Sequence, residues 1–345
     1  ETLEPAIKAF DEAGAALSPV DAKLAANLKE STSFLSEFFF GLQLICAGKD
    51  TSYVYSAQLS RSKSNRGQEM LCAEKLDIGE ELAQRWLPEM HSVVFTSATM
   101  AVSHNFDHFD AAVGLSKGDF SHQSRELDSS FNFDENMAVV VPKDIPEPND
   151  ARYLQVLEDV LYDIHVGMGG SVLTLFTNRR DMEQLYERLK SRLAENGLLL
   201  ECQERSGSAR HLRDRFVADE ACSLFALKSF WEGFDAVGDT LRCVVIPRLP
   251  FASPNDPISK ERSQREERAW WRYSLPEAVI ATKQAAGRLI RSGSDKGILV
   301  LADSRVVSKR YGKQFLNSLP KKQASIVYRD DVKNFIARWR EEHGA

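Results

Sequence analysis

The chain has 345 residues, 43% hydrophobic and 27% charged, which is the composition of an ordinary soluble globular protein with one to three domains. Its formal net charge of -6 provides no overall field for nucleic acid, so any such binding must use local basic surface. No apolar run reaches the roughly 18 residues of a membrane span and the chain does not open on a signal-peptide pattern, so we expect a cytoplasmic protein with no membrane partner.

Residues 1–47 are predicted to be helical, with a fresh helix beginning around Pro19 and Asp21. In this second helix apolar residues recur at near-helical intervals, which predicts one buried face. Its members are Leu24, Leu28, Phe34, Phe38, Leu42 and Ile45. The aromatic run 38–40 is interpreted as core or an interdomain contact in preference to a surface that stacks on bases.

The next segment changes character. Short strands are predicted at 53–55 and 70–72, on either side of a polar, basic hairpin loop at 61–66. An amphipathic helix at 80–86 and a strand at 93–99 should follow. From 100 to 136 the signals are those of a solvated connection, and the histidines and aspartates there fit no known pattern of metal ligands.

After residue 136 the chain alternates strands and helices. Continuous apolar runs are predicted as strands at 137–141, 171–176, 198–202, 223–227, 243–246 and 298–302. Most have a helical pattern between them, which indicates a parallel sheet covered on both faces. Ligands and the motif residues are therefore expected beyond the carboxyl ends of the strands. Asn178 should cap the helix after its strand, and a terminal amphipathic helix is predicted at 330–342.

The stretch 284–291 organises this part of the chain. Pro276 can open a helix, and periodic apolar residues predict that it continues to Arg291, with Arg288 and Arg291 on one face. Gly287 costs about 1 kcal/mol inside a helix, which suggests that something packs closely there. Two guanidinium forks side by side suit a phosphate that gains charge during a reaction. The alternative is a surface helix whose arginines pair with residues such as Asp295.

Four stretches in order carry a family resemblance. Residues 93–99, 172–178, 229–238 and 284–291 resemble motifs III, IV, V and VI of superfamily 2 helicases, and specifically of the DinG/XPD family. The resemblance extends over about 76–319. It implies an α/β fold with a RecA-like second motor domain at 126–345, the carboxy-terminal portion of a first motor domain at 51–125, and a helical remnant of an Arch domain at 1–50.

The sequence lacks two parts that a helicase motor needs. It contains neither a phosphate-binding loop of the type G-x-x-x-x-G-K-[ST] nor a DEAH-type box to hold magnesium. Motif III is present, but the phosphate-binding loop and the DEAH-type box that should precede it are not. We therefore interpret the chain as the carboxy-terminal part of a longer protein. ATP and Mg²⁺ are then expected in the parent protein, and the missing amino-terminal motor domain is expected as a partner.

Residue roles follow from the resemblance. Arg291 matches an arginine finger that reaches the γ-phosphate, and Arg288 and Gln284 match neighbouring phosphate contacts. Further residues match positions that sense the nucleotide or couple hydrolysis to DNA movement, namely Gly233, Asp235, Ser97 and Thr99, together with Glu232, which alternatively orients an arginine. Single-stranded DNA is the expected substrate, held by Thr177, Asn178 and Ser229. Thr177 and Asn178 stand at a strand end, where side-chain and backbone donors suit a phosphate.

Five cysteines stand at wide spacings, with no C-x-x-C pair. This pattern argues against disulfides and structural zinc and predicts buried reduced thiols. Many relatives in the family carry a four-cysteine iron–sulfur cluster, but no ligand set for one is evident in this chain.

A basic and aromatic cluster at 262–273 leaves two interpretations. It contains Arg262, Arg265, Arg268, Trp270, Trp271, Arg272 and Tyr273. Such a mixture is typical of a single-strand groove, but the favoured alternative is an amphipathic helix with tryptophans in the core and arginines paired with nearby glutamates. For the whole chain, two functions remain: part of an ATP-dependent DNA helicase that moves 5′ to 3′, or a non-catalytic nucleic-acid-binding or regulatory module that kept the fold.

Overall fold

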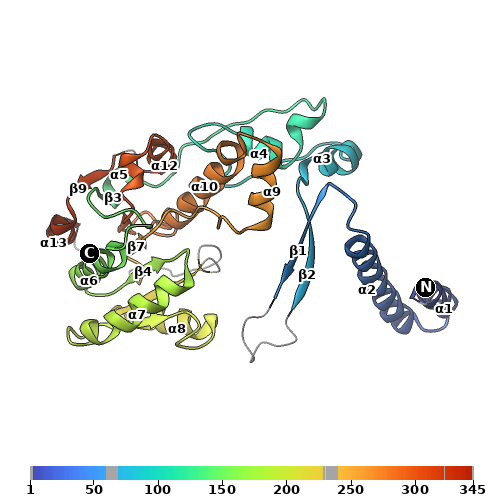
Figure 1. The fold of residues 1–345 in the computed structure, drawn as a ribbon, viewed down its shortest axis with the longest axis horizontal. Coiled ribbons are helices and arrows are strands. Elements are labelled where there is room, and N and C mark those ends of the chain that lie inside the picture. The colour runs from blue at the N-terminus through green and yellow to red at the C-terminus, as the bar shows by residue number, and fades with distance from the viewer. Residues whose placement is uncertain (1–2, 60–68, 228–229, 231–239, 322, 344–345) are drawn as a thin grey trace.

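The computed structural model describes residues 3–59, 69–227, 230, 240–321 and 323–343. It shows an α/β body built on one large sheet, with a hairpin and a pair of helices projecting from one side (Figure 1). Within the described residues no helix combines the length and apolar character needed to cross a bilayer.

Seven strands form the sheet of the body. They are β3 (Met137–Pro142), β4 (Val172–Leu175), β5 (Leu199–Cys202), β6 (Cys222–Ala226), β7 (Cys243–Ile246), β8 (Gly297–Leu301) and β9 (Ser325–Val327). Their order is β5-β6-β4-β7-β8-β3-β9, and every neighbouring pair is parallel. The predicted parallel sheet is confirmed. Only the three-residue edge strand β9 was not expected, because it is too short to show a pattern.

Helices cover both faces of this sheet. One face packs against α8 (Ala209–Ala218), α10 (Leu275–Ala286) and α12 (Gly312–Ser318), and the other against α6 (Tyr153–Met168), α7 (Arg179–Ala194) and α13 (Val332–His343). The strands are apolar on both sides because each face meets helices. Two short helices, α9 (Pro257–Arg265) and α11 (Arg305–Ser308), follow β7 and β8.

Helix α10 ends earlier than predicted. Gly287 is its C-cap, and the residues from Gly287 to Gly293 form turns leading toward β8. Asp295 accepts hydrogen bonds from the backbone amides of Arg291 and Ser292, both at 2.8 Å, and so stabilises this turn in place of another helical turn. Arg288 and Arg291 therefore follow the helix, and the prediction that they share one helix face is wrong.

Two helices and a hairpin form the projecting part. Helices α1 (Leu3–Leu17) and α2 (Ala22–Ala47) meet at a turn, where Asp21 caps α2 by accepting from the amides of Lys23 and Leu24. Strands β1 (Tyr53–Gln58) and β2 (Met70–Lys75) pair as the predicted hairpin. The loop expected at 61–66 lies outside the described residues.

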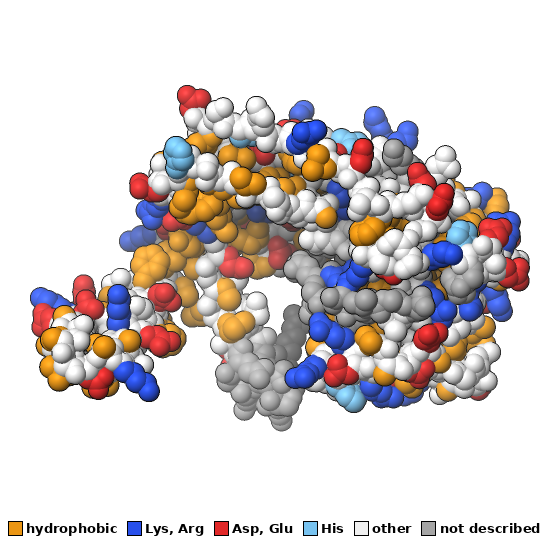
Figure 2. All heavy atoms as spheres, turned by 180° about the vertical axis from the view of Figure 1, so that it is seen from behind, with side chains coloured by type: hydrophobic (Ala, Val, Ile, Leu, Met, Phe, Trp, Pro, Cys, Tyr) orange, Lys and Arg blue, Asp and Glu red, His pale blue; other side chains and the backbone are white. Residues whose placement is uncertain are grey.

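The buried face predicted for α2 is not observed. Only Ala25 and Thr32 are buried in this helix, whereas Phe34, Phe38 and Phe40 are 67%, 52% and 60% exposed. Helix α2 packs mainly against α1, and one neighbour covers only a narrow stripe of a helix. In Figure 2 this pair projects as a separate lobe with hydrophobic side chains on its surface.

The segment between the hairpin and β3 also differs from expectation. The predicted helix at 80–86 is α3 (Gly79–Glu81) continued by a π-helical turn, Leu82–Trp86. The predicted strand at 93–99 is not observed: residues 98–99 form a turn, and no strand of the described chain pairs with residues 93–97. The predicted loop at 100–136 contains α4 (Asp107–Ala112), a 3₁₀ turn at Leu115–Lys117, and α5 (Phe133–Asn136).

Candidate functional site

A cavity at the end of α10 collects residues from two distant stretches. Its volume is about 620 Å³, and we call it the arginine cavity. Its polar lining includes Thr99 from the 93–99 stretch and, from the end of α10 and the following turn, Lys283, Gln284, Arg288 and Arg291. The predicted phosphate-contacting residues are therefore assembled at one place, together with one of the two coupling residues.

The arginine cavity does not lie beyond the carboxyl ends of the strands, where the sequence analysis predicted the motif residues. Helix α10 runs back across the sheet, so its end and the following turn precede β8. Asn136, directly before β3, donates from Nδ2 to the Gly293 carbonyl of this turn at 2.9 Å. The turn that carries Arg288 and Arg291 consequently lies by the amino ends of β3 and β8, and the prediction that all motif residues stand beyond the carboxyl ends is wrong.

Burial shapes the electrostatics of the arginine cavity. Arg288 is 9% exposed. Burial lowers the pKa of Arg291 below its ordinary value, with the Asp295 charge opposing that shift. Burial would raise the pKa of Asp295, but hydrogen bonds from Ser292 and from the Arg291 amide hold it below its ordinary value. The site therefore holds partly desolvated positive charge, which strengthens its attraction for an anion.

The structure bears on two further expectations, the close packing at Gly287 and the pairing of the arginines with Asp295. A Cβ placed on Gly287 would meet only backbone oxygens of Lys283 and Gln284, at 3.5 and 3.7 Å, which are ordinary contacts. Among the residues that the structure describes, none packs closely against Gly287, which lies on the wall of the cavity. The alternative partner Asp295 does interact with Arg291, through the backbone amide and through its charge.

Lys283 is a cavity residue that the sequence reasoning missed. Its Nζ donates to the Ala101 carbonyl at 3.3 Å and lies 4.0 Å from Glu126. Burial lowers the pKa of Lys283, and Glu126 opposes this shift. Its place beside Gln284 was the available signal. The contact joins α10 to the segment that follows residues 93–99.

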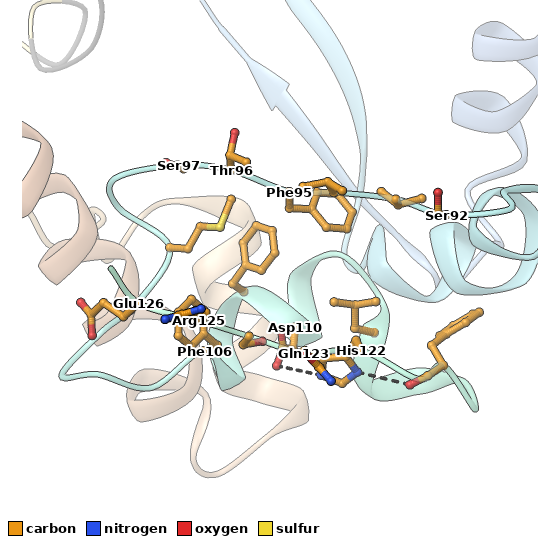
Figure 3. A pocket seen from close by; sticks show the side chains of 18 of the residues that line it. Ser92, Phe95, Thr96, Ser97, Phe106, Asp110, His122, Gln123, Arg125 and Glu126 are labelled. Carbon is orange, nitrogen blue, oxygen red and sulfur yellow. Dashed lines mark hydrogen bonds and ion pairs between the residues drawn. The ribbon is translucent and has the colours of Figure 1, made fainter. Parts of the chain in front are cut away.

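Residues 92–97 line a second cavity, of about 710 Å³ (Figure 3). The extended chain from Ser92 to Ser97 crosses one side, and Asp110 and His122 form an ion pair at 3.5 Å on the other. Ser97 lines this cavity and not the arginine cavity, although its Oγ lies 3.3 Å from Thr99 Oγ1. The two predicted coupling residues, Ser97 and Thr99, thus line two different cavities.

A third cavity, of about 910 Å³, lies at the carboxyl ends of the strands, and we call it the strand-end groove. Thr177 and Asn178 follow β4 there, as predicted, and Asn178 caps α7 by accepting from the Arg180 amide at 2.9 Å. Two arginines that the sequence reasoning did not assign, Arg248 after β7 and Arg305 after β8, share the groove. Their positions within four residues of a strand end were the available signal.

In the basic and aromatic cluster at 262–273, the structure agrees with the favoured interpretation at some residues and differs from it at others. Trp270 packs against the core and Trp271 is 53% exposed. Arg265 pairs with Glu261 at 2.7 Å and Arg272 with Glu266 at 3.3 Å, as the favoured alternative predicts. The single helix is not observed, because α9 ends at Arg265 and a π-helical turn begins at Trp270.

Four predicted site residues, Ser229, Glu232, Gly233 and Asp235, lie outside the described residues.

The five cysteines are free thiols. Cys202, Cys222 and Cys243 are buried, and burial raises the pKa of Cys202 and of Cys222 to about 12. Cys46 is exposed and Cys72 is half-buried, so the prediction of burial fails for these two. Across the described ranges no three His, Cys, Asp or Glu side chains are grouped so that they could hold a metal ion.

Comparison with known proteins identifies the family. A model described as "Helicase C-terminal domain" matches residues 162–322. The chain is 30% identical over 326 residues to "3'-5' exonuclease DinG" of Bacillus subtilis, covering 92% of this chain and 35% of that protein. It is 33% identical over 254 residues to "ATP-dependent DNA helicase YoaA" of Escherichia coli, covering 72% of this chain and 39% of that protein.

The fold comparison agrees. The solved structure titled "XPD_APO" matches with a TM-score of 0.59 at 19% identity, covering 89% of this chain and 59% of that one. The chain spans little more than a third of the length of the two curated relatives described above. With a parallel sheet of the RecA-like type, the chain belongs to the DinG/XPD family of superfamily 2 helicases and corresponds to the carboxy-terminal part of its members.

Proposed function

We propose that this chain is the second motor domain, with adjoining pieces, of an ATP-dependent DNA helicase that moves 5′ to 3′ on single-stranded DNA in the cytoplasm. The observation that carries the proposal is the arginine cavity, where Thr99 meets Gln284, Arg288 and Arg291 across 185 or more positions of sequence. A shared cavity supports a shared ligand. Partly desolvated guanidinium groups suit the charge that develops on a transferring phosphoryl group.

Arg291 is the proposed arginine finger, with Arg288 and Gln284 as neighbouring phosphate contacts. Ser97 and Thr99 are proposed to couple hydrolysis to DNA movement, and Thr177 and Asn178 to contact a DNA phosphate. The same roles are proposed for the undescribed residues: Gly233, Asp235 and Glu232 at the nucleotide, and Ser229 at DNA. ATP and Mg²⁺ would be held mainly by a first motor domain elsewhere in the parent protein, with residues 51–125 as its last portion and 1–50 as an Arch remnant.

Steady-state ATP hydrolysis by the full-length parent, with and without single-stranded DNA, tests the proposal. Arg291→Ala should lower turnover by roughly 10³-fold or more while changing ATP affinity modestly. Arg188→Ala is the matched control, since this arginine of α7 pairs with Glu158 of α6 and lines neither the arginine cavity nor the strand-end groove. The chain alone should hydrolyse no ATP.

A fully active Arg291→Ala parent would remove the proposed role of this residue. DNA binding by a wild-type parent that hydrolyses no ATP would favour the second candidate, a non-catalytic binding or regulatory module. The desolvated arginines favour the helicase, because a module without a nucleotide has no use for them.

A further inference from the structure

Behind Arg305 of the strand-end groove lies a buried carboxylate that the proposed function does not use. Asp303, the second residue after β8, is 1% exposed. It accepts hydrogen bonds from Arg305 through the backbone amide at 3.1 Å, Nε at 2.9 Å and Nη2 at 2.6 Å. A bidentate pair of this kind fixes the plane and direction of the guanidinium.

The same carboxylate holds the neighbouring loop. Asp303 Oδ2 also accepts from the Leu249 amide at 2.8 Å, in the loop that leaves β7. That loop is held a second time by Tyr153, whose hydroxyl donates to the Pro247 carbonyl at 2.8 Å. One buried group therefore joins the exits of two adjacent strands.

The loop and the arginine share the groove with aromatic rings. Phe251 lies in the loop, with its ring 5.5 Å from Trp270 and 5.6 Å from Tyr311, and the Arg305 guanidinium lies 5.7 Å from the Phe251 ring centre. All four side chains line the strand-end groove. Within the described part of the chain, Arg305 Nη1 donates to no acceptor, so one donor of the oriented fork is available to a ligand.

We propose that Asp303 is a positioning residue for single-stranded nucleic acid: it orients Arg305 toward a phosphate and holds Phe251 among the rings on which the adjacent base stacks. The inference rests on the proposed function, because it assumes that the groove carries the DNA strand. A cation beside an aromatic surface is the combination that binds a strand without regard to its sequence.

The direction in which Asp303→Asn changes DNA affinity tests this role. Asp303→Asn removes a negative charge from a nucleic-acid groove, so the overall field alone would tighten DNA binding. The positioning role requires the opposite result. We expect Asp303→Asn to weaken binding of a labelled oligothymidylate at least about tenfold, measured by fluorescence anisotropy at several salt concentrations.

Two arginine variants separate charge from geometry. Arg305→Lys keeps the charge but loses the fork, so binding should weaken while the dependence on salt stays as in the wild type. Arg305→Ala should weaken binding and reduce the slope of log affinity against log salt by about 1. These variants also keep the inference testable if Asp303→Asn does not fold, which its melting curve would show.

Glu183→Gln is the matched control. Glu183 on α7 pairs with Arg179, another arginine of the groove, at 2.8 Å, and its second partner, Arg205 at 3.0 Å, does not line the groove. Its loss should leave DNA affinity equal or slightly tighter. Equal or tighter binding by folded Asp303→Asn, or by Arg305→Lys, would overturn the positioning role alone. A wild-type chain that binds no single-stranded DNA at any salt concentration would instead overturn the proposed function.

Discussion

Aromatic side chains are buried in the sheet body but exposed on α2. Phe225 on β6 is fully buried, with its ring 4.9 Å from Phe176 and 5.6 Å from His165. Phe40 on α2 is 60% exposed. Phe225 lies in an apolar run predicted as a strand, and Phe40 lies in the aromatic run 38–40 interpreted as core or an interdomain contact. An apolar run therefore does not report whether a neighbour covers its side chains. Stability should therefore reside in the body, and three measurements can break or sharpen this contrast.

The largest difference is expected from truncating the two phenylalanines. Phe225→Ala should lower the free energy of unfolding by about 3–5 kcal/mol, because it opens a cavity in a packed core. Phe40→Ala should change it by less than about 0.5 kcal/mol, as is usual at exposed positions. Urea unfolding followed by tryptophan fluorescence measures both. Equal losses would show that α2 is covered in solution.

A smaller effect is expected from the buried histidine of the body. His165 is fully buried, its Nε2 lies 3.2 Å from Thr174 Oγ1, and burial lowers its pKa to about 3. As the pH falls below the ordinary histidine pKa of about 6.5, His165 becomes protonated in the unfolded chain but stays neutral in the folded chain. The free energy of unfolding should therefore decrease as the pH is lowered, by about 2 kcal/mol for this group between pH 7 and pH 5.

Unfolding free energies at these two pH values check the expectation. His165→Gln should flatten the pH dependence by that amount, whatever its absolute stability. The exposed His211 serves as the control, and His211→Gln should leave the dependence as it is in the wild type. A pH profile of His165→Gln that matches the wild type would contradict the expectation.

The smallest effect compares two helix caps. Asn178 caps α7 in the body and Asp21 caps α2 in the projecting part, each by a side-chain oxygen that accepts backbone amides. Asn178→Ala should destabilise the body by about 1 kcal/mol. Asp21→Ala should lower amide protection in α2 but leave the body unchanged, which hydrogen exchange resolves helix by helix. Protection lost across the body after Asp21→Ala would show that the two regions unfold together.

The sequence predicted the body well, for a physical reason. Buried strands such as β4 and β7 have apolar residues on both faces, and this signal is local. The cap at Asn178 is local as well. The end of α10 was predicted less well, since the apolar residues Leu289 and Ile290 keep a helical spacing although the turn held by Asp295 replaces the helix there.

The site was predicted only in part. Motif resemblance selected Thr99 and Arg291, but no local pattern shows that residues so far apart line one cavity. The rule that ligands lie beyond strand ends suits Thr177 and would also have identified Arg305. It fails for Arg288 and Arg291, because α10 returns the chain to the opposite edge of the sheet.

The order of the strands constrains how the protein is made. β3 comes first among the strands of the sheet, yet its two neighbours, β8 and β9, are the last two in the chain. A ribosome must therefore release nearly the whole body before β3 finds either partner. During synthesis this apolar segment has both edges unpaired, a condition that favours aggregation and chaperone capture. Such distant pairing also predicts slow refolding of the isolated chain.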